Sequence, residues 1–157
     1  MDETFRTLNL THPATGEELT LLVGCLGTIV RPAYIDRAGG KRKAQEKKAG
    51  LGSKGRHQVN LKSPDKHGKQ RQWLRKRYQL VAAAWHGYEF GSDYQIHHID
   101  GDPTNDSADN IVPLTQDEHT KVHALLREGF DPHEAVAEVL MARGDDDRDD
   151  LATEATA

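Results

Sequence analysis

The feature that most constrains the fold is a strand, a turn, a second strand and a capped helix in direct succession. The residues of 93–99 predict a short strand, and 100–105 are turn-forming residues that close it. Ile111–Leu114 predicts a second short strand. Thr115–Glu118 has the Ser/Thr-x-x-Glu form of a capping box, so a helix should begin after Thr115 and end near Gly129. We therefore expect a β-hairpin that packs against a helix.

Four histidines fall within this pattern. His97 and His98 lie on the first predicted strand, whereas His119 and His123 lie on the capped helix. Residues four apart share one helical face, so His119 and His123 could bind the same divalent metal. The alternative is a pair of solvated or core histidines without a metal. A hairpin folded onto the helix favours the metal, because it brings the strand histidines close to the helical pair.

Other features limit the class of protein. The single cysteine, Cys25, excludes an internal disulfide and any zinc site built on paired thiolates. No apolar run reaches the ~18 residues of a membrane helix, and Met1–Glu3 lacks the basic start of a signal peptide. The sequence thus predicts a cytoplasmic protein with no membrane partner. Its oligomeric state cannot be derived from these features, and we favour a monomer.

The net charge of −4 conceals a strong asymmetry along the chain. Residues 31–80 hold sixteen basic and three acidic residues, whereas residues 81–157 hold four basic and eighteen acidic residues. A segment of +13 beside one of −14 indicates a polyanion-binding surface, with a solvated basic loop as the alternative.

The remaining patterns divide the chain into five parts. Two or three short strands are expected before residue 37, a basic hairpin at 57–75, a helix over 77–85 and a helix that begins at Asp131. The predicted parts are an N-terminal β module (1–37), a flexible basic loop (38–56) in which Lys41–Ala49 could be a short helix, a core (57–130), a C-terminal helix (131–143) and a disordered acidic tail (144–157).

The run HHIDGDPTNDSADNIVPLTQDEHTKVH at 97–123 resembles the His-Asn-His (HNH) endonuclease motif. The flanks RYQLVAAAW, GCLGTIVRP and VNLKSPDKHGKQRQWL resemble the helix, N-terminal module and hairpin of phage-type HNH homing endonucleases. The likeness covers about residues 20–127. It implies an α+β fold with a ββα-metal (His-Me finger) core, and a phage or mobile-element origin, with the host cytoplasm as its location.

The resemblance also implies roles for individual residues. It makes His98 the general base, His97 and His119 metal ligands, and His123 a third ligand as in the colicin-like branch. Asn110 would hydrogen-bond backbone across the loop and hold the strand of His98 in place. Because adjacent strand residues point to opposite faces, His97 and His98 can both face the metal only if the strand ends or twists there.

The implied activity is metal-dependent hydrolysis of phosphodiester bonds in double-stranded DNA, by nicking or by cutting both strands. Mg²⁺ or Mn²⁺ is the first expectation for the divalent metal, with Zn²⁺ or Ni²⁺ as alternatives. The expected DNA contacts are the basic residues Lys41, Arg42, Lys43, Lys54, Arg56, Lys62, Lys69, Arg71, Arg75, Lys76 and Arg77.

Two other interpretations remain open at this stage. The chain could be a non-catalytic DNA-binding or phage assembly protein that keeps the finger as a structural element. Alternatively, His97, His98, His119 and His123 could all bind one closed zinc ion, which would leave no base. One departure from the phage-type pattern is Gln79, which stands where relatives usually carry arginine.

Overall fold

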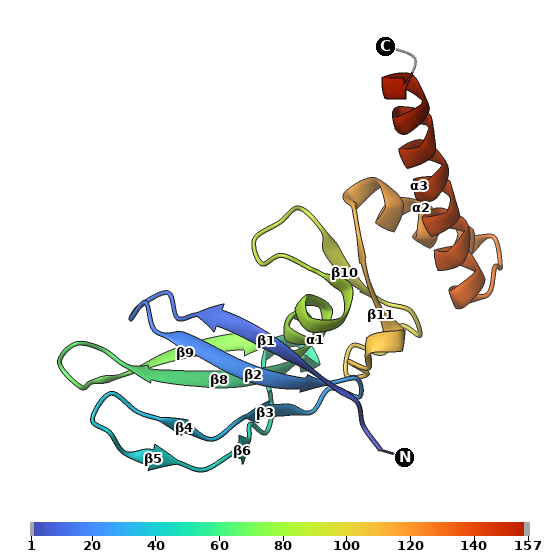
Figure 1. Cartoon of the computed structure of the whole chain (residues 1–157). Helices are drawn as coiled ribbons and strands as arrows, with labels where there is room; N and C mark the ends of the chain where they lie inside the picture. The colour runs from blue at the N-terminus through green and yellow to red at the C-terminus, as the bar shows by residue number, and fades with distance from the viewer. Residues whose placement is uncertain (1, 156–157) are drawn as a thin grey trace.

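The N-terminal third of the protein forms an antiparallel sheet. In the computed structural model, which describes the backbone of residues 2–155 and the side chains of residues 2–144, this sheet has the order β1-β2-β3-β6. Its strands are β1 (Phe5–Thr11), β2 (Glu18–Gly24), β3 (Ile29–Arg31) and β6 (Gln45–Glu46). The turn at His12–Gly16 joins β1 to β2 (Figure 1).

Two further groups of strands lie within the basic segment of residues 31–80. β4 (Tyr34–Ile35) pairs with β5 (Lys41–Arg42), and β8 (His57–Pro64) pairs with β9 (Gln70–Lys76), with β7 (Gly50–Leu51) at the outer edge of β8. The basic hairpin is therefore confirmed. A helix over Lys41–Ala49 is wrong: this stretch forms two-residue strands paired to β4 and β3, and a 3₁₀ turn η1 (Ser53–Gly55) follows it.

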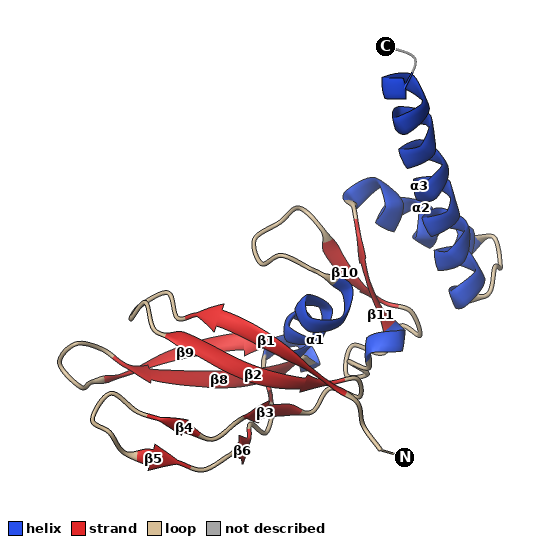
Figure 2. Ribbon diagram, viewed as in Figure 1, coloured by secondary structure: helices blue, strands red, loops and turns tan. Residues whose placement is uncertain are grey.

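Helix α1 (Arg77–His86) packs against these sheets and ends at Gly87, whose positive φ of 66° is the left-handed conformation that glycine favours. The buried side chains Leu80 and Val81 share one core with residues of β1, β2, β3 and β8. The N-terminal sheet, the hairpin and α1 thus form one packed unit (Figure 2, with strands in red and helices in blue).

The predicted ββα unit follows α1. β10 (Gln95–His98) and β11 (Ile111–Leu114) are antiparallel, and the 3₁₀ turn η2 (Ala108–Asn110) precedes β11. α2 (Gln116–Arg127) begins with the expected capping box: Thr115 accepts from the Glu118 amide, and the Glu118 carboxylate accepts from the Thr115 amide. The α+β fold with a ββα core is therefore confirmed.

The C-terminal helix α3 (Pro132–Ala155) begins after Asp131, whose carboxylate caps the amides of His133 and Glu134. A small second core joins α3 to α2, to β11 and to Ile99, which directly follows β10. The helical backbone continues beyond Gly144 to Ala155, whereas the sequence predicted a disordered tail there. A single glycine destabilises a helix by only about 1 kcal/mol, and no proline follows it. Residues 156–157 lie outside the described residues.

No helix in the described part of the chain combines the length and the apolar character that crossing a membrane requires.

Candidate metal and catalytic centre

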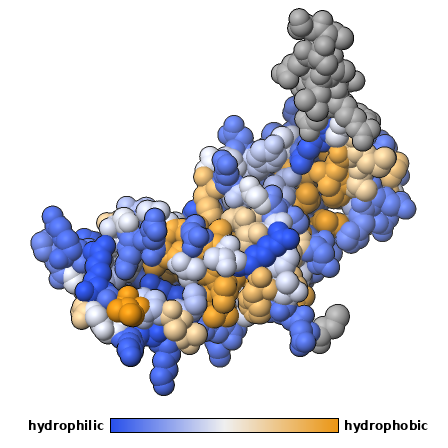
Figure 3. Space-filling model, in the orientation of Figure 1, coloured by the Kyte–Doolittle hydropathy of each residue, from blue (hydrophilic) through white to orange (hydrophobic). Residues whose placement is uncertain are grey.

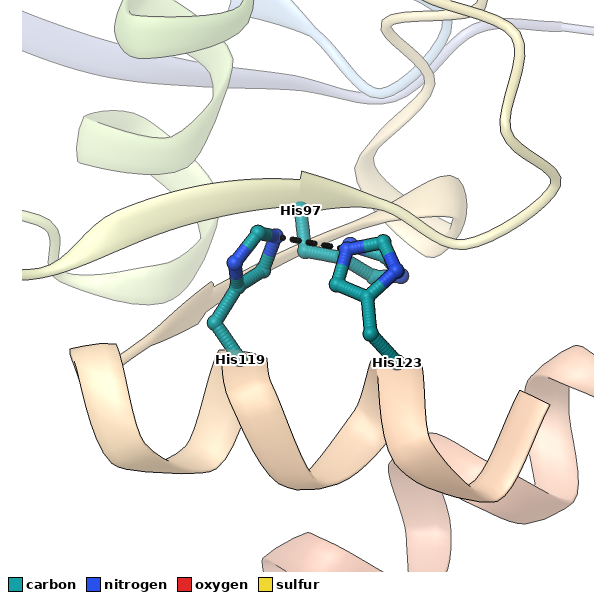
Figure 4. Close-up of side chains that lie close together, drawn as sticks. All are labelled: His97, His119 and His123. Carbon is teal, nitrogen blue, oxygen red and sulfur yellow. Dashed lines mark hydrogen bonds between the residues drawn. The ribbon is translucent and has the colours of Figure 1, made fainter. Parts of the chain in front are cut away.

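Three histidines meet between the finger hairpin and helix α2. His97 projects from β10, where it is paired with Val112, toward His119 and His123 on α2 (Figure 4). One nitrogen from each imidazole lies within 4.8 Å of the other two, and the Nε2 atoms of His119 and His123 are 3.2 Å apart. Two ligands at about 2.1 Å from a tetrahedral ion are about 3.4 Å apart, so the helical pair already has the spacing of a metal site.

The environment favours the neutral forms of His97 and His119. Burial lowers the pKa of His97 to about 4, with further contributions from the nearby His119, His123 and His98. Burial, and then His123, also lower the pKa of His119. A neutral imidazole offers a lone pair to a metal, and a protonated one does not.

The His97 ring supports the same conclusion. Its Nε2 is buried and has no hydrogen-bond partner among the described residues. An orphaned buried nitrogen is costly unless it binds something, and an ion between the three rings would satisfy it. Three protein ligands leave a fourth position of a tetrahedral site open, as in catalytic rather than structural sites.

His98 faces the opposite side of the strand. β10 remains paired as far as His98 with Ile111, and the Ile99 amide donates to the Asn110 carbonyl at 2.7 Å. The expected end or twist of the strand between His97 and His98 is therefore wrong, because regular pairing keeps the alternation of side chains. A closed site of four histidines is wrong for the same reason, since His98 is not part of the cluster.

His98 is instead held by a buried carboxylate. Its Nε2 lies 2.8 Å from Asp106 Oδ1, and the other carboxylate oxygen accepts from Nε of Arg77 at 2.9 Å. Asp106 is fully buried, and His98 also packs edge-on against Tyr78. The sequence analysis missed Asp106 because its partners lie 8 and 29 residues away.

Asn110 makes the backbone hydrogen bonds expected of it. Its side-chain oxygen accepts from the Asp100 amide at 3.1 Å, and Nδ2 donates to the Asn105 carbonyl at 2.9 Å. The same Nδ2 donates to the Asp100 carboxylate, whose pKa is lowered first by its hydrogen bond from the Asn105 side chain. Asn110 thus ties together the two ends of the loop that joins His98 to β11.

The structure divides the expected DNA contacts into three groups. Arg77 is held by Asp106, and Arg75 is half-buried with its guanidinium over the rings of Trp73 and Phe90. Arg42 and Arg71 form ion pairs with carboxylates of neighbouring loops. The remaining lysines and Arg56 lie on the surface or are half-buried: Lys41, Lys43, Lys54, Arg56, Lys62, Lys69 and Lys76.

Two comparisons relate this chain to known proteins. The family model described as HNH endonuclease matches residues 77–121, which includes His97, His98 and His119 and ends two residues before His123. A solved structure from work on DNA binding and cleavage by the HNH homing endonuclease I-HmuI aligns at 22% identity and a TM-score of 0.46. That alignment covers 78% of this chain and 62% of the other, so the present chain spans less than two thirds of that protein. No curated protein matches the chain.

The resemblance inferred from residues 97–123 is thus confirmed by an independent match of residues 77–121 to the HNH endonuclease family model.

Proposed function

We propose that this protein is a metal-dependent DNA endonuclease that hydrolyses phosphodiester bonds, encoded by a phage or mobile element and active in the cytoplasm of its host. The observation that supports this most strongly is the meeting of His97, His119 and His123 next to a histidine that a buried carboxylate orients. A site with three nitrogen ligands and one open coordination position suits catalysis at a phosphate, whereas a structural metal site has all its positions filled by protein ligands.

His97, His119 and His123 would hold the metal. Imidazole ligands suit Zn²⁺ or Ni²⁺, whereas Mg²⁺ and Mn²⁺ prefer oxygen ligands, so we place Zn²⁺ or Ni²⁺ ahead of Mn²⁺ and Mg²⁺. When bound, a divalent cation supplies Lewis-acid stabilisation of the negative charge that develops on the phosphate and on the leaving oxygen.

His98 would act as the general base. If its Nε2–H donates to Asp106, the lone pair resides on Nδ1, which can take a proton from an attacking water. Asp106 fixes the tautomer and the ring orientation, and Arg77 fixes Asp106. Asp106 and Arg77 are positioning residues, because neither would touch the reacting atoms.

The opposite directions of His97 and His98 are compatible with one substrate position. Within the described residues β10 pairs only with β11, so β10 has a free edge. A phosphate that lies along this edge can contact side chains from both faces of the strand. The exposed cations of the basic segment would bind the flanking DNA backbone through its phosphates, with little base readout.

Conversion of supercoiled plasmid to nicked or linear DNA tests the proposal. We expect the wild-type protein to convert plasmid with Mn²⁺, Zn²⁺ or Ni²⁺ and to be inactive in EDTA, and we expect His119→Ala to be inactive with every metal. If the protein binds DNA but converts no plasmid with each of the three metals, the enzymatic proposal is refuted and the non-catalytic alternative is favoured.

A further inference from the structure

A basic groove of about 930 Å³ lies between the β4–β5 hairpin and the turn that joins β8 to β9. These elements lie at the end of the molecule away from β10 and α2 (Figure 1). Seven cationic and three acidic side chains line the groove. In Figure 3 hydrophilic side chains dominate the projecting hairpins of this end.

Other groups already engage the three acids. Asp36 pairs with Arg42 at 2.8 Å, and Asp65 pairs with Arg71 at 2.9 Å. Glu17 accepts a hydrogen bond from the Ser63 hydroxyl. The carboxylates of the groove are thus committed to neighbours other than its central cations.

Arg31, Lys47 and Lys62 form no ion pair with the side chains of residues 2–144. Arg31 stacks over the Tyr34 ring at 3.8 Å and donates to the Lys62 carbonyl at 3.4 Å. Lys47 is half-buried, and its ammonium donates to the side chain of Gln45 at 3.1 Å. These contacts order Arg31 and Lys47 without neutralising them.

The three charges repel one another. Burial, followed by the charges of Arg31 and Lys62, lowers the pKa of Lys47. Repulsion between neighbouring cations is relieved when an anion binds among them. The groove is far larger than a single phosphate ion, and its cations come from β3, β8 and the segment after β6, so an extended polyanion fits it better than a small ion does.

We propose that Arg31, Lys47 and Lys62 bind backbone phosphates of DNA in this groove, at a second contact remote from the histidine centre. The choice of DNA as the polyanion rests on the proposed function. Arg31 and Lys47 were not among the contacts expected from the sequence. Such a contact would position the duplex and strengthen binding without reading its sequence.

The test measures binding of a labelled duplex by fluorescence anisotropy over a range of salt concentrations, in EDTA so that no cleavage occurs. The variants are Lys47→Ala and Lys62→Ala, alone and combined. Lys48→Ala is the matched control, because Lys48 is the exposed next residue and does not line the groove. Lys47→Arg keeps the charge and should retain wild-type affinity.

We expect each alanine variant to bind about fivefold more weakly at low salt and to lose about 0.9 from the slope of log K against log salt, with the two losses adding in the double variant. A double variant with the affinity and slope of Lys48→Ala would overturn the proposal. So would saturable binding of inorganic phosphate that Lys47→Ala abolishes while DNA affinity is unchanged, because that result would indicate a small-anion site. Absence of cleavage by the wild-type protein would refute the proposed function alone, since this binding measurement does not depend on it.

Discussion

Acidification should destabilise the metal-free protein through His97. The His97 ring is buried, and in the native state its pKa is lowered to about 4, against about 6.5 in an unfolded chain. Below pH 6.5 the unfolded state therefore binds a proton that the native state does not bind. Stability is present in full above the unfolded pKa and is lost as the pH falls from there toward 4.

The size of the effect follows from the two pKa values. Between pH 7.5 and pH 5.0, proton uptake by the unfolded state lowers the free energy of unfolding by about 2 kcal/mol for this one residue. The groups that face the ring are the imidazoles of His119 and His123 on α2, and that of His98 beside it in the chain, so no described carboxylate offsets the effect.

Urea unfolding of wild type and His97→Gln in EDTA, at both pH values, isolates this contribution. The measured quantity is the change in the free energy of unfolding between the two pH values within each protein, so a difference in overall stability between the variant and the wild type does not affect it. We expect the wild type to lose about 2 kcal/mol more than His97→Gln does between pH 7.5 and pH 5.0. Equal losses in the two proteins would mean that His97 titrates normally, and the argument for a buried neutral ligand would fail.

Three further predictions concern the parts that support the site. Asp106→Asn, which removes the charge that orients His98, should lower the cleavage rate about 10- to 100-fold with little change in the KM for DNA; a change in KM alone would contradict this role. Glu118→Ala removes a capping box and the ion pair with α3 and should cost about 1–2 kcal/mol in urea unfolding, whereas Asp117→Ala should cost less than half of that. Saturating Mn²⁺ or Zn²⁺, at about 100 times Kd, should stabilise the wild type by about 2.7 kcal/mol, and an equal shift in His119→Ala would place the metal elsewhere.

The sequence predicted those parts of the fold that short-range patterns specify. The capping box at Thr115 depends on residues three apart, and the pairing of His119 with His123 depends on the repeat of the helix. The β10–β11 hairpin followed from turn residues between two apolar runs. In the first two cases the determining contacts lie within four residues, and in the third each strand and the turn are recognisable from their own residues, so the local sequence contains the information.

The parts that were missed depend on contacts between distant segments. The direction of His98 is set by continued pairing of β10 with β11, and its partner Asp106 is fixed by Arg77 from the start of α1. Arg77 was expected to contact DNA, but no local pattern shows that a buried carboxylate holds it. The backbone of the acidic C-terminal segment is helical, although its composition predicted disorder.

Cleavage by His98→Ala tests the central claim most directly. Wild type and variant are first titrated calorimetrically with the same metal, and plasmid nicking is then followed with both proteins saturated. We predict that His98→Ala keeps its metal affinity within about threefold, because His98 is not a ligand, and that it cleaves at least about 100-fold more slowly, because the general base is gone. Equal nicking by the two metal-loaded proteins would contradict the account.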